Sequence, residues 1–395
     1  MGESIFGLMH KDIVLALISI EGDVPTGVKI NPDTIVHFPI GYEKSKQGVL
    51  DFLKNRGVPA TRKGFRGNPS NITPFQYMLQ NLGLSLTDCY WLKPLNSNYQ
   101  WNSVNLFKND FRETFSLDLL MDRGNIVGAT NFIPSASLKG DLQKKWLPSS
   151  NGRRVLVKGN YSDGCLQSIS EVFASRIYDM QPYQIPHVKY NFIQISSGGE
   201  EIVGCQCYNF CSEDSEFVPA IDIVNEWKKP NNVNYYNYYI EICKANGLDV
   251  QSFYDLETSV DFIISNLDRH YNNFGILRNP QTLVWTSVAP VFDSGNSLFY
   301  KSSYIPVDKG LLNLKATASY EDEVKLLSLV QNRGILNVGA LPKEDVLYQL
   351  LCFDKTLDEE RKERIVRAYK GKIKYFIDFQ NGAKIWSYGY KKGVN

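Results

Sequence analysis

The chain has 395 residues, of which 43% are hydrophobic and 13% aromatic, so it is long enough to bury the cores of two or three domains. Lysine and arginine total 43 against 42 for aspartate and glutamate, a formal net charge of +1. This balance argues against a surface built as a whole for nucleic acid or membranes, although it leaves room for local charged patches.

The N-terminal segment gives no sign of secretion or membrane anchoring. It has no basic stretch before its apolar run, and that run, Ile13 to Ile20, is too short to span a bilayer. Phe6 stands where a myristoylation signal would have Ser or Thr. We therefore expect a cytoplasmic protein that does not contact a membrane.

The seven cysteines are odd in number and scattered, which favours reduced thiols over a disulfide framework. Cys205, Cys207 and Cys211 follow a C-x-C-x3-C spacing that matches no zinc pattern, and no histidine lies near them. We predict that they are small apolar residues of a buried strand.

Residues 1–120 are predicted to form a separate α/β region. A strand is expected at "DIVLALISI" and helices at "KQGVLDFLKNRG" and "TPFQYMLQNLG", the last opened by a typical Thr-Pro start. The Asn- and Ser-rich "PLNSNYQWNSVN" is predicted to be a loop, which places a domain boundary near residue 120. No motif in this region indicates its role.

Two further regions follow. In residues 121–212, strand-like "RRVLVKG" and "VGCQCYNF" and helix-like "LQSISEVFASRIYDM" predict a small sheet with one helix. Residues 213–395 are mostly helical by their apolar spacing, up to Leu267 and again in "EERKERIVRAYKGKIKYFIDF". One hairpin, "FGILR" joined to "TLVWTSV", interrupts the helices. The expected fold class is therefore α+β.

Polar residues concentrate in "SNLDRHYNNFG", residues 265–275. Asp268 and Asn273 have the D-x-x-x-x-N spacing of a protein-kinase catalytic loop. In such a loop a carboxylate orients the attacking hydroxyl and accepts its proton, while an amide oxygen holds Mg²⁺ against the phosphates. Asp and Asn are also common in turns, so this pair by itself does not identify a site.

Three more residues occur in the order that a kinase requires. Asp293, in "FDSG" after the hairpin, stands where kinases have the Asp of D-F-G. Lys158 ends "VLVK", similar to the V-A-I-K strand, and Glu171 on the next helix could pair with it to hold the α- and β-phosphates. Each alone could be a solvated charge or a turn residue, but the complete order predicts a phosphotransferase.

These residues resemble the HipA family of bacterial Ser/Thr kinases. "NLDRHYNNFGIL" and "APVFDSG" match its D-x-H-x-x-N loop and its P-x-[YF]-D turn, and the resemblance spans about residues 130–385. It implies a protein-kinase-like two-lobed fold, with a sheet-rich N-lobe (121–212) and a mostly helical C-lobe (213–395). It also implies Asp268 as catalytic base, Asn273 and Asp293 as Mg²⁺ ligands, and Lys158 and His270 at the ATP phosphates. Read by itself, His270 could equally be a structural histidine.

The same resemblance identifies "SLKGDLQKK" as the loop that covers the phosphates, with one Gln a place later than in the family's S-x-x-G-x-Q-x-K pattern. Ser137 corresponds to the serine whose autophosphorylation shuts such kinases down, and Ser135 is the next candidate. The implied nucleotide contacts come from Lys139, Gly140, Asp141, Leu142, Gln143 and Lys144 in the loop, and from Tyr208, Asn209 and Phe210 at the hinge beside adenine.

The resemblance implies an ATP- and Mg²⁺-dependent serine/threonine protein kinase, in this family a growth-inhibiting toxin limited by autophosphorylation. Its protein substrate would be a translation factor such as an aminoacyl-tRNA synthetase, and its partner a DNA-binding antitoxin. Residues 1–120 do not match the family's usual N-terminal module, which leaves the docking of an antitoxin open.

Two other functions remain open. A small-molecule phosphotransferase of the aminoglycoside-kinase type also has Asp and Asn five apart, but its usual histidine two residues before the Asp is Asn266 here. A nucleotide-binding pseudokinase or interaction module is the second alternative. The intact set of Lys158, Asp268, Asn273 and Asp293 argues against it.

Overall fold

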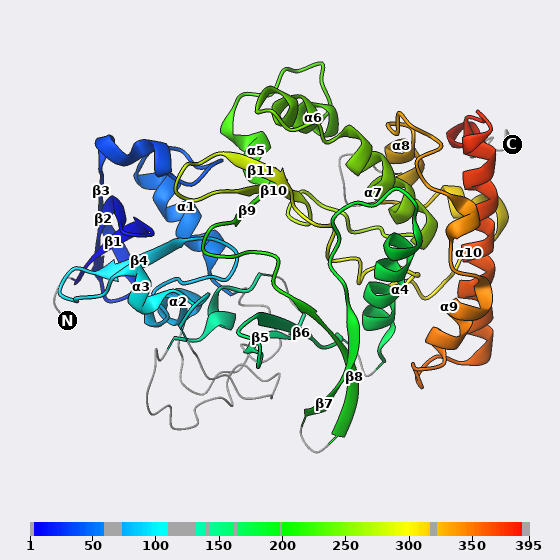
Figure 1. Cartoon of the computed structure of the whole chain (residues 1–395), viewed down its shortest axis with the longest axis horizontal. Helices are drawn as coiled ribbons and strands as arrows, with labels where there is room; N and C mark the ends of the chain where they lie inside the picture. The colour runs from blue at the N-terminus through cyan, green and yellow to red at the C-terminus, as the bar shows by residue number, and fades with distance from the viewer. Residues whose placement is uncertain are drawn as a thin grey trace, which may run out of the picture.

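The computed structural model describes residues 4–58, 73–109, 132–139, 142–161, 164–197, 200–316 and 322–388. Within these ranges the chain forms three antiparallel sheets and a set of helices, which confirms the expected mixed α+β composition. The N-terminal sheet lies at one end of the molecule and the long C-terminal helix at the other (Figure 1).

A four-stranded sheet with the order β3-β2-β1-β4 forms the N-terminal region. Apolar residues of its strands, such as Leu8, Ile18 and Leu92, pack against Phe52 and Met78 of two helices on one face. The elements of this region are β1 (Ser4–His10), β2 (Ile13–Glu21), β3 (Val24–Ile30), η1 (Pro32–His37), α1 (Lys46–Arg56), α2 (Pro74–Gln80), β4 (Tyr90–Pro94) and α3 (Trp101–Val104).

The predicted strand of this region is β2, and both predicted helices are confirmed as α1 and α2. Thr73 caps α2 as its sequence indicates, accepting a hydrogen bond from the backbone N–H of Gln76 at 3.1 Å. The loop predicted at "PLNSNYQWNSVN" is partly wrong, because Trp101 begins the short helix α3. Trp101 is buried in a cluster with Met9 and Trp91, and this burial orders the turn.

The second sheet has the order β5-β6-β8-β7, and helix α4 packs against β7 and β8. The predicted strands correspond to β6 and β8, and the predicted helix coincides with α4. Cys205 and Cys207 on β8 and the nearby Cys211 are buried, as predicted. The elements are η2 (Pro134–Ser137), β5 (Lys144–Pro148), β6 (Arg154–Lys158), α4 (Leu166–Met180), β7 (Asn191–Ser197) and β8 (Glu200–Tyr208).

The third sheet has the order β11-β10-β9, with β9 (Glu216–Pro219), β10 (Gly275–Arg278) and β11 (Trp285–Val288). The predicted hairpin is confirmed as β10 and β11, which pair antiparallel. Strand β9 was not predicted, because four residues that end in proline carry no periodic signal. Its pairing with β10 joins the segment after β8 to the catalytic-loop hairpin.

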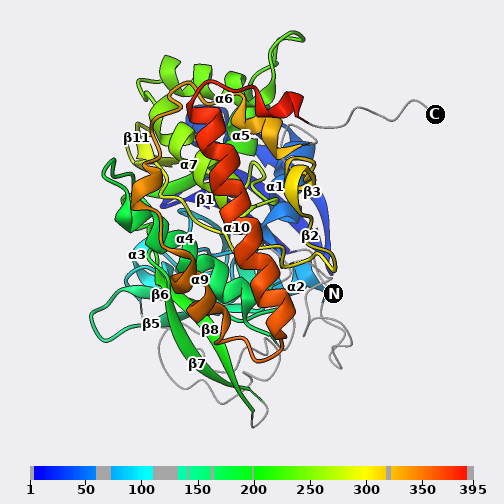
Figure 2. The same ribbon diagram turned by 90° about the vertical axis from the view of Figure 1, so that its right-hand side faces the viewer.

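Helices dominate the remainder of the described chain, as predicted. The longest of them, α10, packs against α7 and α9 (Figure 2). These elements are α5 (Ala220–Glu226), α6 (Tyr235–Ala245), α7 (Gln251–Ile264), η3 (Asp308–Leu312), α8 (Glu323–Leu327), η4 (Val338–Ala340), α9 (Glu344–Leu351), α10 (Glu359–Gln380) and η5 (Ile385–Ser387).

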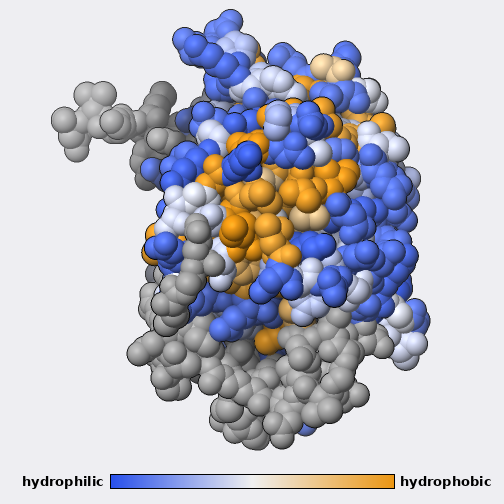
Figure 3. All heavy atoms as spheres, turned by 90° about the vertical axis from the view of Figure 1, so that its left-hand side faces the viewer, coloured by the Kyte–Doolittle hydropathy of each residue, from blue (hydrophilic) through white to orange (hydrophobic). Residues whose placement is uncertain are grey.

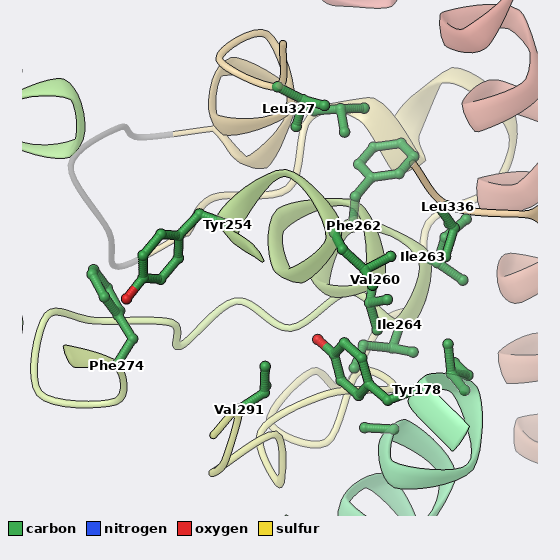
Figure 4. Close-up of a cluster of buried hydrophobic side chains, with 14 of the residues drawn as sticks. Tyr178, Tyr254, Val260, Phe262, Ile263, Ile264, Phe274, Val291, Leu327 and Leu336 are labelled. Atoms are coloured by element: carbon green, nitrogen blue, oxygen red, sulfur yellow. The ribbon is translucent and has the colours of Figure 1, made fainter. Parts of the chain in front are cut away.

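The largest core cluster surrounds α7. Phe262, Ile263 and Ile264 on this helix lie near Tyr178 of α4, and all four are buried (Figure 4). Truncating a buried aromatic residue of this kind costs about 3–5 kcal/mol. Helix α7 ends at Ile264, and the left-handed backbone of its C-cap Ser265 (φ 53°) turns the chain toward the predicted catalytic loop. The core thus fixes where that loop begins.

The surface of the N-terminal region carries exposed apolar side chains. Figure 3 shows apolar residues gathered on this side of the molecule. The large exposed apolar residues of the region include Ile5, Leu17, Val24, Ile35 and Val36. Among the described helices, none combines the length and the hydropathy that crossing a bilayer requires.

Candidate active site

A cavity of about 630 Å³ lies between the second sheet, the catalytic-loop hairpin and the N-terminal region. Its wall combines Lys158 of β6 and Asn273 of the loop after α7 with Tyr42 and Asp88 of the N-terminal region. Pockets of this size and mixed polarity are typical of small-ligand sites. The cavity is therefore the candidate active site, and the N-terminal region forms part of it.

Most of the residues predicted to contact a nucleotide line this cavity. They are Lys139, Lys144, Lys158, Tyr208, Asn209, Phe210, His270, Asn273 and Asp293, together with Ser137. Glu171 and Asp268 do not line it but contact residues that do. Leu142 and Gln143 are not among its lining residues, and Gly140 and Asp141 lie outside the described part of the chain.

Three charged side chains meet at the wall of the cavity, which Lys158 and Asp293 line. The ammonium group of Lys158 donates to Glu171 Oε1 and, at 2.6 Å, to Asp293 Oδ1. Glu171 also accepts a hydrogen bond at 2.8 Å from the backbone N–H of Ser294. The side chains of Lys158 and Glu171 are 5% and 2% exposed, whereas that of Asp293 is 38% exposed. Asp293 is therefore the carboxylate of the three that reaches the solvent.

Local backbone geometry brings these residues together. Lys158 ends β6, and Glu171 lies in the second turn of α4, which packs on the same sheet. Asp293 has a left-handed backbone (φ 60°), which Asp tolerates better than most residues and which turns the chain sharply after Phe292. A Cβ at Gly295 would lie 3.4 Å from Glu171 Oε1, an ordinary contact distance, so this turn lies directly beside α4.

Burial and the neighbouring charges shift the pKa values of all three groups. Burial opposes the charge of Lys158, but Asp293 and Glu171 raise its pKa well above the usual value. Burial also opposes the charge of Asp293, yet Lys158 and Lys144 hold its pKa well below the usual range. Burial raises the pKa of Glu171 against the pull of Lys158. Asp293 thus stays ionised and available to a cation.

The residues of the predicted catalytic loop are held by a local hydrogen-bond network. The backbone N–H of Asp268 donates to Asn266 Oδ1 at 3.2 Å, and its carbonyl accepts from Asn273 Nδ2 at 3.2 Å. Because the amide nitrogen of Asn273 is engaged in this way, its amide oxygen is the atom that could ligate a metal. His270 lies in the same turn, where its ring Nδ1 is 3.3 Å from the backbone nitrogen of Asn272.

Arg269 connects the predicted catalytic loop to the turn that carries Asp293, a role that its sequence position did not reveal. Its guanidinium group pairs with Asp261 of α7 at 2.8 Å and 3.0 Å. The same group donates to the carbonyl oxygens of Asn273 and Phe292 and to Ser294 Oγ. One buried cation therefore holds Asn273 and the 292–294 turn in a fixed relation.

The predicted hinge lies against the N-terminal region. Asn209 Nδ2 donates to the carbonyl of Leu86 at 2.9 Å, so this side chain faces the N-terminal region. Phe210 belongs to an aromatic cluster with Phe217 and Phe292 that lines the cavity. Burial raises the pKa of Cys207, a neighbouring lining residue, to about 12, so this thiol stays protonated.

The two candidate serines of the phosphate-covering loop have different surroundings. Ser137 lies at the cavity wall, half-buried, and its hydroxyl donates to the carbonyl of Leu84 at 2.6 Å. Ser135 is fully buried, and its hydroxyl accepts from the backbone N–H of Trp146 at 3.2 Å. Of the two hydroxyls, that of Ser137 is closer to the surface that a nucleotide would occupy.

One polar residue of the cavity was not predicted. Asp222, on α5, lines the same cavity as Lys139, and burial raises its pKa to about 6 against the pull of Lys139. Gly41 of the N-terminal region packs so closely on the Asp222 backbone that a Cβ there would lie 2.3 Å from the carbonyl oxygen. No sequence signal could have found this residue, because its position depends on the packing of the N-terminal region.

The residues present fit a divalent cation bound together with phosphates. Asn273 and Asp293 offer an amide oxygen and a carboxylate, which are hard oxygen ligands of the kind that Mg²⁺ prefers. Among the described residues, no group of three or more His, Cys, Asp or Glu side chains forms a metal site without a ligand's help.

No family model matches the sequence, and no curated protein matches it. Among solved structures, the chain is similar to the crystal structure of a Helicobacter pylori proinflammatory kinase, CtkA, with a TM-score of 0.42 and 16% identity. The similarity covers 62% of this chain and 95% of that chain.

Proposed function

We propose that the chain is an ATP- and Mg²⁺-dependent serine/threonine protein kinase of the HipA-like type, with a two-lobed kinase domain. The observation that carries this proposal is the contact of Lys158 with both Glu171 and Asp293 at a cavity that Asn273 also lines. A kinase needs this set of residues to hold the phosphates and their metal, and here the chain brings it together from four separate elements.

The residues have separate tasks in this proposal. Lys158, fixed by Glu171, would bind the α- and β-phosphates, while Asn273 and Asp293 would hold Mg²⁺. Bound Mg²⁺-ATP supplies the γ-phosphoryl group and, through the cation, neutralises its charge. Asp268 would orient the acceptor hydroxyl and accept its proton. Lys139 and Lys144, on the cavity wall, add positive charge where the phosphates would lie.

Replacing Asp268 tests the proposal most directly. Asp268→Asn is expected to abolish phosphoryl transfer while the affinity for an ATP analogue stays within about tenfold, because a catalytic base acts mainly in the transition state. The measurements are transfer of labelled phosphate from Mg-ATP and titration of the analogue, each against the wild type. Wild-type turnover in the variant would remove Asp268 from the role of base.

The protein substrate would be a translation factor such as an aminoacyl-tRNA synthetase, and the biological role growth inhibition, as the resemblance to HipA implies. An antitoxin partner would belong to the same proposal. Phosphoproteomics after induced expression of the wild type, compared with Asp268→Ala, would identify the substrate. Phosphorylation of small aminoglycosides but of no protein would favour the aminoglycoside-kinase alternative instead.

A further inference from the structure

A chain of side-chain amides runs from helix α4 to the carboxylate of Asp268. Gln167, on the first turn of α4, donates through Nε2 to Asn296 Oδ1 at 3.3 Å. Asn296 in turn donates through Nδ2 to Asp268 Oδ2. Gln167 is 7% exposed and Asn296 is partly buried, so water competes little for these contacts.

The backbone N–H of Tyr161 sets the direction of the hydrogen bonds from Gln167 to Asn296 and on to Asp268. The backbone N–H of Tyr161 donates to Gln167 Oε1 at 2.8 Å, and a backbone N–H cannot act as an acceptor. Gln167 must therefore present its NH₂ group to Asn296, which must present its oxygen to Gln167. The NH₂ group of Asn296 is then left to face Asp268. A donor to the Asp268 carboxylate is thus fixed by a backbone group outside the cavity.

The same helix also contacts the adjoining turn. Glu171, four residues after Gln167 and so on the same face of α4, accepts from the backbone N–H of Ser294. The Cβ that Gly295 lacks would lie 3.6 Å from the carbonyl oxygen of Gln167. The turn from Asp293 to Asn296 is therefore seated directly on α4, which limits the freedom of Asn296 to move away.

We propose that Gln167 and Asn296 are positioning residues that hold the Asp268 carboxylate in one orientation, with helix α4 as their support. This inference rests on the proposed function of Asp268 as the catalytic base. A single helix then sets both halves of the active site: Glu171 orients Lys158, and Gln167 orients Asp268 through Asn296. Neither Gln167 nor Asn296 touches the substrate in this role.

We call the hydrogen bonds from Gln167 through Asn296 to Asp268 the amide relay. Changing the donor at Gln167 into an acceptor tests the proposal. In Gln167→Glu both neighbours of Asn296 are carboxylates that only accept, so they compete for its single NH₂ group and Asp268 loses or shares its donor. We expect kcat to fall about 100-fold, with the KM for ATP within about threefold, because misplacing a reacting group by about 1 Å has this effect on the chemical step. Gln167→Met, of similar shape, removes the relay without adding a competing carboxylate and should lose about tenfold in kcat. Arg176→Ala, at an exposed position of the same helix, should retain wild-type kinetics.

A double-variant cycle separates a relay from two independent structural effects. If Gln167 acts through Asn296, the double variant Gln167→Met with Asn296→Ala loses no more kcat than Asn296→Ala alone. Additive losses, or a rise in the KM for ATP with kcat unchanged, would overturn the proposal. Thermal unfolding of each variant identifies any loss that comes from misfolding.

A measurement that does not depend on catalysis can test the hydrogen bonds of Asn296 separately from the proposed kinase activity. The side-chain NH₂ resonances of Asn296, assigned by their loss in Asn296→Ala, should shift in both Asp268→Ala and Gln167→Glu. Resonances that stay unmoved in both variants would refute the relay even in an active kinase. Conversely, a wild-type chain that transfers no phosphate would refute the proposed function, while the resonances still decide whether the relay exists.

Discussion

Asp293 combines three properties that a metal-binding carboxylate requires. It lies in a turn with a left-handed backbone. Lys158 keeps its carboxylate ionised, and 38% of its side chain is exposed. The neighbouring Glu171 is also a carboxylate, but it is buried and engaged by Lys158 and Ser294. The two acids therefore differ in accessibility, and Asp293 is the one suited to a metal.

Asp293→Asn preserves the shape and the left-handed backbone and removes the charge. We expect weaker Mg²⁺-dependent binding of ATP as well as a loss of turnover of at least about tenfold, because the phosphate charges lose a carboxylate contact through the cation. The measurement is ATP-analogue affinity as a function of Mg²⁺ concentration. Asp214→Asn, at an exposed carboxylate, is the control, and an unchanged Mg²⁺ dependence in Asp293→Asn would place the metal elsewhere.

Helix α4 has no side-chain cap of its own at Cys165, and a distant residue supplies one. Asp354, between α9 and α10, accepts from the backbone N–H of Cys165 at 2.7 Å and from Thr356 Oγ1 at 2.6 Å. A Cβ at Gly164 would lie 2.6 Å from the Asp354 carboxylate, so this junction requires glycine. The helix that carries Glu171 is therefore anchored to the C-terminal helices rather than free to swing.

Removing this anchor should affect both stability and turnover. Asp354→Ala leaves the buried N–H of Cys165 without an acceptor, and we expect a loss of about 1–3 kcal/mol in the free energy of unfolding. If α4 positions the active site, kcat should also fall, by about tenfold, in the fraction that remains folded. Denaturant unfolding and steady-state kinetics measure the two effects. Normal kcat in a destabilised variant would show that α4 keeps its place without Asp354.

We expect autophosphorylation in the predicted phosphate-covering loop, at Ser137, to inhibit the kinase. Phosphorylation of Ser137 would add about −2 charge at the cavity wall and break its hydrogen bond to Leu84, which should displace the loop and repel ATP. Peptide mass spectrometry after incubation with Mg-ATP should find phosphate at Ser137 in the wild type and none in Asp268→Ala. An active enzyme with an unmodified loop would exclude this control, and phosphate at Ser135 would move the acceptor.

At the scale of the whole molecule, a buried polar cluster joins the N-terminal region to the third sheet. Glu216, which begins β9, pairs with Arg278 of β10 at 2.8 Å and lies 3.1 Å from the ring of His10 on β1. Its carboxylate also accepts from the backbone N–H of Cys89, and Arg278 donates to the hydroxyl of Tyr90. This cluster holds the N-terminal region against the cavity.

The cluster should make the stability of the molecule depend on pH. Burial alone would raise the pKa of Glu216, but His10 and Arg278 lower it from its ordinary 4.5 to about 2. A lowered carboxyl pKa stabilises the fold above pH 4.5, and this contribution is lost as the pH falls from about 4.5 to about 2. Glu216→Gln should therefore cost about 3–5 kcal/mol at pH 7, because Arg278 stays buried without its charge partner.

The difference between Glu216→Gln and the wild type should shrink as the pH falls from 4.5 toward 2, because the carboxyl group of the unfolded wild-type chain binds a proton in this range. Denaturant unfolding at pH 7, 5 and 3 measures this change. Asp214→Asn, which alters the exposed pair with Lys11 in the same interface, should cost less than about 1 kcal/mol at all three values. A cost for Glu216→Gln that stays constant across this range would contradict the linkage.

The amino-acid sequence by itself determined the elements with strong local signals. The apolar periodicity of α4 and α7, the Thr73 start of α2 and the hairpin of β10 and β11 were all predicted, because these signals lie within a few residues of one another. The order of Lys158, Glu171, Asp268, Asn273 and Asp293 is a prediction of another kind, of which the structure shows the contacts of Lys158 with Glu171 and Asp293. Their chemistry and spacing predicted a phosphotransferase site without any knowledge of contacts.

Tertiary structure alone decided which other residues complete this site. Arg269, Asn296 and Asp354 act on groups that lie up to 189 positions away in the sequence, and no local pattern encodes such contacts. The placement of the N-terminal region at the cavity has the same origin, since it depends on Glu216 meeting His10 across 206 positions. Periodicity and turn chemistry report on neighbours along the chain, whereas buried ion pairs and amide relays form only when distant elements pack together.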